Sequence, residues 1–210
     1  MKISKLQRNR GFTLIETMIA VFILVLAMNG LLGLISSSLF SARYAKNEMI
    51  ANYLIQETID SIRNDRDTIA FQNISGESWG NFINKYGTYN GSNDSIKKCY
   101  SANGCEIDPA EMPVSIVTCG DTATSPYSIT CRTLNYDENA NNNGFYTYNN
   151  AYPLSNFKRQ VKMSVNSLPD SAGLPVANAE LEIKVTVEWL NGSLLRSKAY
   201  RVSLVNWYKL

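Results

Sequence analysis

The first forty residues divide into a basic leader and a long apolar segment. Residues 12–40 are almost wholly apolar or small, with Glu16 as the one charge and Asn29 as the main polar interruption. A run of about 20 such residues is long enough to cross a bilayer as a helix. The positive-inside rule places the start of this helix in the cytoplasm and the rest of the chain outside. The basic residues of the leader are Lys2, Lys5, Arg8 and Arg10.

A second periodic pattern follows directly over residues 41–70. Apolar positions recur at helical spacing on one stripe, and polar residues lie opposite, which predicts an amphipathic continuation of the same helix. No proline occurs before Pro109, so nothing in the sequence breaks the helix between the two segments. The stripe comprises Tyr44, Ala51, Ile55, Thr58, Ile59, Ile62 and Ile69, and the opposite face comprises Lys46, Glu57, Asp60 and Asn64.

Strict alternation appears in the last segment, residues 153–210. Leu181, Ile183, Val185, Val187 and Trp189 alternate with polar residues, which predicts a strand with one buried face. Asn191-Gly192 predicts a two-residue hairpin turn that sets Ile183 opposite Tyr200, Leu181 opposite Val202 and Glu182 opposite Arg201. Another strand is expected over 157–165. The predicted fold class is α+β: a long N-terminal helix packed on a C-terminal antiparallel sheet.

The middle segment, residues 71–152, is rich in Asn, Tyr, Gly and Ser and predicts a loop-rich insertion. Short strands are plausible over 114–119 and 127–132. All four cysteines lie here, and an even number outside the cytoplasm indicates two disulfides. Three pairings are possible, of which the two local ones are favoured because they staple loops that lack a core. These join Cys99 to Cys105 and Cys119 to Cys131.

Charge and composition narrow the classes of function. The chain of 210 residues is 45% hydrophobic, which fits a folded protein. Four of its 20 basic residues lie in the leader, so the rest of the chain has 16 basic and 18 acidic residues and is slightly acidic. No nucleic acid is therefore expected to bind the body of the protein. Histidine is absent, which excludes His-based catalysis and His metal sites.

Glu16 is the anomaly of the apolar segment, because a carboxylate in a membrane helix is costly unless it is paired. Cleavage between Gly11 and Phe12 would create an α-amino group at the membrane surface that a neighbouring chain could pair with Glu16. The helix macrodipole also favours a negative charge near this end. Two alternatives remain: an uncleaved signal anchor, and a secretory signal cut near Ala42.

At these residues the sequence resembles the type IV prepilin family, whose N-terminus reads basic leader, Gly, aromatic residue, then Thr-Leu-Ile-Glu. Resemblance implies that a prepilin peptidase removes residues 1–11, that Phe12 is N-methylated, and that Glu16 docks against the Phe12 amine of an adjacent subunit. Family members often carry a proline within the apolar helix, where this chain has Asn29-Gly30 and Gly33. The matching run is Arg10-Gly11-Phe12-Thr13-Leu14-Ile15-Glu16.

Residues 54–63 resemble the helix end of minor pilins and pseudopilins of the PilV and GspI types. The resemblance therefore implies a minor pilin, a structural subunit of a filament, with a pseudopilin of a type II secretion system or a DNA-uptake pilus component as the alternative. Implied partners are other pilin or pseudopilin subunits, the peptidase and an inner-membrane assembly platform. The protein would lie in the inner membrane before assembly and then in the filament. No cofactor is implied.

Weaker patterns suggest other chemistry. Asp137, Asn139 and Asn141 alternate like calcium ligands, but the glycine and glutamate of an EF-hand loop are missing from their expected positions. Ser155 and Lys158 form a Ser-x-x-Lys pattern outside a helix, so enzymatic activity is not expected. A membrane-anchored adhesin or binding module using residues 136–152 is the alternative from another class.

Overall fold

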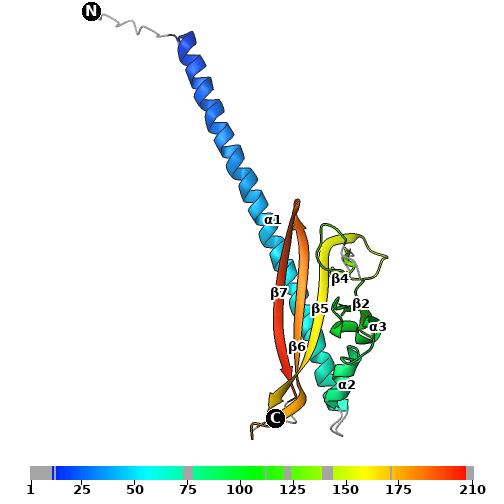
Figure 1. Cartoon of the computed structure of the whole chain (residues 1–210). Coiled ribbons are helices and arrows are strands. Elements are labelled where there is room, and N and C mark those ends of the chain that lie inside the picture. Colours follow the sequence, from blue (N-terminus) through cyan, green and yellow to red (C-terminus); the bar gives the residue numbers. More distant parts are fainter. Residues whose placement is uncertain are drawn as a thin grey trace, which may run out of the picture. The chain divides into compact units, whose positions relative to one another are not determined.

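The structure is a computed structural model that describes residue 11 and residues 13–72, 78–111, 113–120, 124–138, 144–170 and 172–206. It divides into two units, Met1–Ala45 and Lys46–Leu210. Helix α1, Leu14–Gln72, begins in the first unit and ends in the second (Figure 1). The uninterrupted helix predicted from the absence of proline is therefore present.

In the first unit, α1 is long and apolar enough to cross a membrane. Its side chains from Leu14 to Phe40 are exposed. Polar side chains within it bond to the preceding turn: the Thr17 hydroxyl donates to the Leu14 carbonyl at 2.8 Å, and the Asn29 amide donates to the Val25 carbonyl at 2.9 Å. Such bonds satisfy polar groups without a partner helix, which is what a hydrocarbon environment requires.

The second unit is built on a seven-stranded antiparallel sheet. Its long strands are β5 (Leu154–Pro169), β6 (Pro175–Asn191) and β7 (Leu194–Val205), paired in that order. The other edge of β5 pairs with two shorter strands, β1 (Cys105–Asp108) and β3 (Thr133–Asp137). Strand β2 (Ser115–Thr118) extends β1, and β4 (Phe145–Thr147) extends β3. The α+β class expected from the sequence is confirmed.

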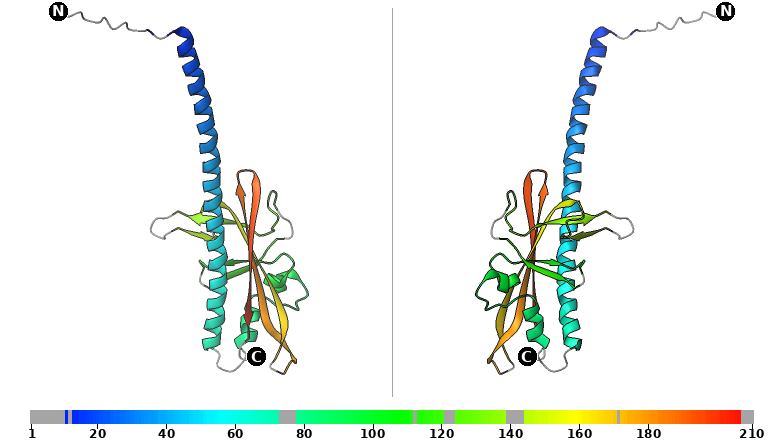
Figure 2. Two further views of the ribbon diagram at one scale, coloured as in Figure 1. Left: turned by 90° about the vertical axis from the view of Figure 1, so that its left-hand side faces the viewer. Right: turned by 90° about the vertical axis from the view of Figure 1, so that its right-hand side faces the viewer.

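Short helices and the last turns of α1 cover this sheet. Helix α2 (Ser78–Lys85), α3 (Asp94–Lys97) and the 3₁₀ turn η1 (Lys98–Tyr100) all come from the middle segment. Figure 2 shows the C-terminal part of α1 and strand β4 on one side of the long strands and α3 on the other. The middle segment is thus more than loop, because it supplies four of the seven strands.

The β6–β7 hairpin has a different register from the predicted one. The turn is Gly192–Ser193 rather than Asn191-Gly192, and Ile183 consequently faces Val202 instead of Tyr200. Gly192 has φ of +66°, a conformation that glycine adopts at low cost at the first central position of a hairpin turn. Moving the turn by one residue shifts each partner by two, so every side chain keeps its predicted face.

The strand expected over 127–132 is also wrong, since the strand β3 begins only at Thr133. The backbone before it bonds to a side chain instead of to a neighbouring strand. The Glu188 carboxylate accepts the backbone N–H of Ser128 at 2.8 Å and that of Ile129 at 3.1 Å. Ile129 is buried, so the apolar residue within 127–132 marks burial and not strand pairing.

The stripe predicted on α1 is largely confirmed as the face that packs on the sheet. Its buried residues include five of the predicted set, Ala51, Ile55, Thr58, Ile59 and Ile62, together with Leu54, while Ile69 is half-buried. Glu57 was expected to lie fully opposite, but its side chain is only 38% exposed. Arg159 is the reason for the difference.

Arg159 ties three elements together from a fully buried position on β5. Its Nη1 donates to the Glu57 carboxylate of α1 at 3.0 Å, and its Nη2 donates to the Ile107 carbonyl of β1 at 2.7 Å. The guanidinium also lies 5.8 Å from the ring centroid of Tyr148. A buried cation needs such partners, because removing its counter-charge leaves an uncompensated charge in the core.

Two disulfides hold the middle segment, Cys99 to Cys105 and Cys119 to Cys131, which are the local pairs favoured above. The backbone N–H of Cys119 donates to the Gly104 carbonyl at 3.0 Å. The two cross-linked loops therefore lie side by side, with all four cysteines buried.

Tyrosines that are buried or half-buried pack around α2 and β4. The Tyr86 hydroxyl donates to Asp65 Oδ2 at 2.5 Å, and the Tyr100 hydroxyl donates to the Ile83 carbonyl at 3.0 Å. Burial raises the pKa of both phenols above the ordinary value of a tyrosine. Burial, assisted by the nearby Tyr136, raises the pKa of Tyr146 to about 12.

The Arg159 tie predicts a large difference between two acidic residues one turn apart. We expect Glu57→Gln to lower the free energy of unfolding by about 3 kcal/mol, because it leaves the buried guanidinium without a carboxylate. Asp60→Asn is the control, since Asp60 is 71% exposed and its ion pair with Arg63 should contribute less than about 1 kcal/mol. Denaturant unfolding of the full chain in detergent micelles measures both. Equal losses for the two variants would contradict the role given to Arg159.

The buried tyrosines predict alkaline unfolding of the second unit. A pKa raised in the folded state leaves stability intact below the unfolded value of about 10 and removes it as pH rises toward the folded value, about 12 for Tyr146. Tyr146→Phe should therefore move the alkaline midpoint to higher pH without changing stability at neutral pH. Circular dichroism of the micellar chain across this range tests the shift, and an unchanged midpoint would refute it.

Candidate processing and assembly site

The start of α1 is shaped by a hydrogen bond from its backbone to Thr13. The backbone N–H of Glu16 donates to the Thr13 hydroxyl at 3.3 Å, and the N–H groups of Glu16 and Thr17 donate to the Thr13 carbonyl at 3.0 and 3.2 Å. Thr13 thus acts as the N-cap, and Glu16 stands three residues after it, the spacing of a capping box. The sequence analysis missed this cap, although Thr-x-x-Glu before an apolar run is a readable signal.

Glu16 is exposed in the first turn of the helix, next to the N–H groups that carry the positive end of the macrodipole. Within the described residues, no lysine or arginine forms an ion pair with its carboxylate. Gly11 is also exposed, with nothing within 4 Å of the position a Cβ would take. Phe12 and the basic leader, residues 1–10, lie outside the described residues.

The interruption of the apolar segment does not break the helix. Asn29, Gly30 and Gly33 all lie within α1, and the Asn29 side chain bonds to its own preceding turn. A Cβ added at either glycine would meet no neighbouring atom within 4 Å. The helix therefore passes through this region in an ordinary conformation.

Of the residues in the calcium pattern, only Asp137 lies within the described part of the chain. Asp137 is 2% exposed on β3, where it pairs with Phe145 of β4. Asn139 and Asn141 lie outside the described residues. Among the residues that the structure describes, no group of three or more His, Cys, Asp or Glu side chains could hold a metal ion.

The Ser-x-x-Lys pair is separated by the strand that carries it. Both residues lie on β5 three positions apart, so their side chains point to opposite faces. The Ser155 hydroxyl donates to the Leu134 carbonyl at 2.7 Å, while Lys158 Nζ donates to the Thr124 hydroxyl at 2.5 Å. Burial lowers the pKa of Lys158, whose hydrogen-bond partner is the Thr124 hydroxyl and not Ser155.

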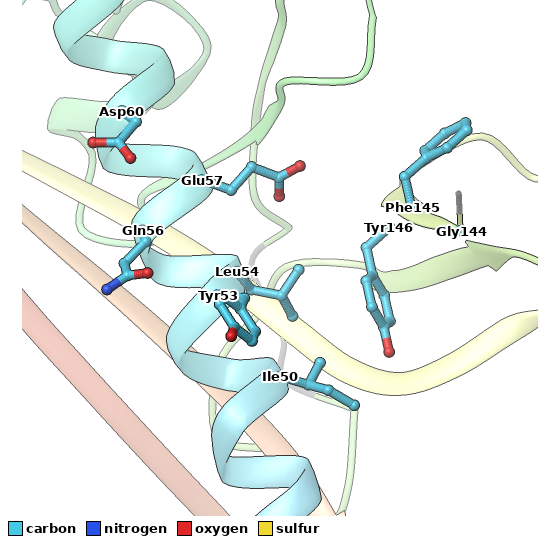
Figure 3. A pocket seen from close by; sticks show the side chains of 9 residues that line it. All are labelled: Ile50, Tyr53, Leu54, Gln56, Glu57, Asp60, Gly144, Phe145 and Tyr146. Carbon is cyan, nitrogen blue, oxygen red and sulfur yellow. The ribbon is translucent and has the colours of Figure 1, made fainter. Parts of the chain in front are cut away.

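A groove of about 420 Å³ lies between α1 and β4, next to the Tyr- and Asn-rich segment. Figure 3 shows Leu54 and Glu57 of the helix facing Tyr146 across this space. The Glu57 carboxylate accepts a hydrogen bond from Nη1 of the buried Arg159. The sequence analysis did not foresee this groove, because its two walls come from segments about ninety residues apart in the chain. Its lining residues are Ile50, Tyr53, Leu54, Gln56, Glu57, Asp60, Gly144, Phe145 and Tyr146.

Comparison with known proteins gives one match, at the N-terminus. The family model described as the prokaryotic N-terminal methylation motif matches residues 6–28. This range contains the Gly11-Phe12 junction, the Thr13 cap, Glu16 and the first half of the apolar helix. Searches of curated proteins and of solved structures found no match.

The matched motif and the structure describe the same N-terminal residues. The motif names a methylated N-terminus, and the structure places a capped helix start directly after the junction, at the head of a helix of membrane-spanning length. The match at residues 6–28 therefore supports a type IV prepilin-like N-terminus.

Proposed function

We propose that this protein is a minor type IV pilin whose N-terminal helix is stored in the inner membrane and then packed into a filament. The single observation that carries the proposal is the methylation motif at residues 6–28 at the head of a helix whose side chains from Leu14 to Phe40 are all exposed. In the membrane, lipid covers these side chains. In a filament, the helices of neighbouring subunits replace the lipid.

Processing supplies the positive counter-charge that the Glu16 carboxylate lacks. Cleavage after Gly11 leaves Phe12 with an α-amino group two residues before the helix begins at Leu14. The Glu16 carboxylate is exposed and can accept this amine from an adjacent subunit. Because an ionised carboxylate in hydrocarbon costs about 3 kcal/mol at the bilayer centre, the pair is favoured only where the two subunits are in register.

Two features of the sequence support minor rather than major status. The helix end resembles that of minor pilins and pseudopilins, and the disulfide-bonded middle segment is unusually large. Such a subunit could initiate assembly or sit at the tip. A pseudopilin of a type II secretion system or a component of a DNA-uptake pilus shares the same N-terminal features. Copurification with sheared surface filaments rather than with an envelope fraction distinguishes the surface pilin from the pseudopilin.

The first test is the mature N-terminus. Intact mass and N-terminal sequencing of the chain from native membranes should show a start at Phe12 carrying one extra methyl group. Replacement of Gly11 by a bulky residue, Gly11→Leu, should leave the leader attached, since the exposed glycine is the residue before the cut. A chain that starts at Met1, or near Ala42, would exclude the prepilin pathway.

The second test separates processing from assembly. Glu16→Gln should be cleaved and methylated normally but lost from filaments, because the neutral amide cannot neutralise the Phe12 amine. Asp67→Asn is the matched control, an exposed acid on the same helix that pairs only with the adjacent Arg66. Filament fractions probed for each variant give the result. Normal incorporation of Glu16→Gln would show that the carboxylate has no role in docking.

A further inference from the structure

Strand β7 leaves one whole edge of the sheet without a partner in the described part of the chain. Its residues, Leu194–Val205, pair with β6 and with no other strand. In an antiparallel hairpin closed by a two-residue turn, alternate residues bond inward and the others point their backbone N–H and C=O groups outward. Asn191 and Leu194 close this turn, so the outward groups belong to Leu195, Ser197, Ala199, Arg201, Ser203 and Val205.

A groove of about 710 Å³ runs along this edge, between β7 and the part of α1 in the same unit. Its lining includes Ile55 and Ile59, which are already buried, the exposed ring of Tyr200, and the charged pair Asp60 and Arg63. A strand added beside β7 would lie against this groove, and every second side chain of that strand would point toward it. Backbone pairing and side-chain burial are thus offered at the same place.

The charge of the edge selects the kind of strand that fits. Within its twelve residues β7 carries Arg196, Lys198 and Arg201 and no acidic residue. Lys198 pairs with Glu48 at 2.7 Å and Arg201 with Glu182 at 3.3 Å, but both pairs are exposed enough to be weak and exchangeable. Opposite charges on neighbouring strands stabilise their pairing, and like charges destabilise it.

We propose that β7 accepts an acidic, extended segment of a partner protein as an eighth strand. A second copy of β7 does not fit, because pairing it with itself would bring basic residues together. The alternative is that the basic residues only protect the edge from pairing with other chains, as lysines do on many edge strands. This inference goes beyond the proposed function and depends neither on leader processing nor on the docking of Glu16.

The direct test uses two synthetic peptides of about ten residues, one alternating Glu and Val and the other alternating Lys and Val, added to the full chain in neutral detergent micelles. The Glu peptide should bind at least about tenfold more tightly than the Lys peptide. Hydrogen exchange should then slow at the outward amides of Ser197, Ala199 and Arg201. The inward amides of Lys198 and Tyr200 serve as an internal control, since they already bond to β6.

Two variants sharpen the result. Ala199→Pro removes one outward N–H without touching the β6 ladder and should weaken the Glu peptide about tenfold or more, whereas Ala199→Ser should bind as the wild type does. Arg201→Gln should weaken it about two- to fivefold. Equal binding of the two peptides, no binding at up to about 1 mM, or slowed exchange away from β7 would each overturn the proposal and leave the basic residues as edge protection. The wild-type exchange pattern decides the matter even if the proline variant fails to fold.

Discussion

The chain contains an apolar surface that it cannot bury by itself, and this constraint governs the rest of the structure. The side chains of α1 between Leu14 and Phe40 are exposed along the whole segment. At about 25 cal/mol for each Å² of apolar surface, such a helix is not stable in water on its own. Lipid or other helices must cover it. The polar groups within it, Thr17 and Asn29, bond to their own helix and are compatible with either environment.

Within the Lys46–Leu210 unit, the last part of the same helix packs into the hydrophobic core. There both apolar contacts and an ion pair hold the helix against the sheet. Ala51, Ile55 and Ile62 pack on the sheet as aliphatic contacts, which fix the face of the helix but not its position along the sheet. The Arg159–Glu57 pair and the bond from Arg159 to Ile107 add fixed distances between named atoms. A directional tie of this kind fixes where the last part of α1 lies along the sheet.

Features with a local cause could be read from the sequence. The long helix, its buried stripe, the long strands and the N-terminal motif at residues 6–28 all follow from periodicity or from residues adjacent in the chain. The predicted β6–β7 register was wrong by two residues. Gly192 can stand at the first or the second central position of the turn, and only the pairing of the whole strands decides between the two. The strand expected over 127–132 failed because Glu188, about sixty residues away, accepts its backbone N–H groups. The partial burial of Glu57 was missed for the same reason, since its partner Arg159 is distant in sequence. Sequence patterns report which residues are buried, but they do not report which polar group satisfies which.

The two surfaces that this chain leaves unsatisfied differ in the physics of their partners. Any apolar surroundings can cover the apolar helix, so under the proposed function lipid and neighbouring helices are exchangeable, and the proposed docking of Glu16 supplies the register. The β7 edge is the reverse case. Backbone groups there accept only an extended chain in a defined alignment, and the basic residues restrict which sequence can provide it. A subunit that combines a non-selective surface with a selective one can enter a common assembly through the first and be assigned a particular neighbour through the second.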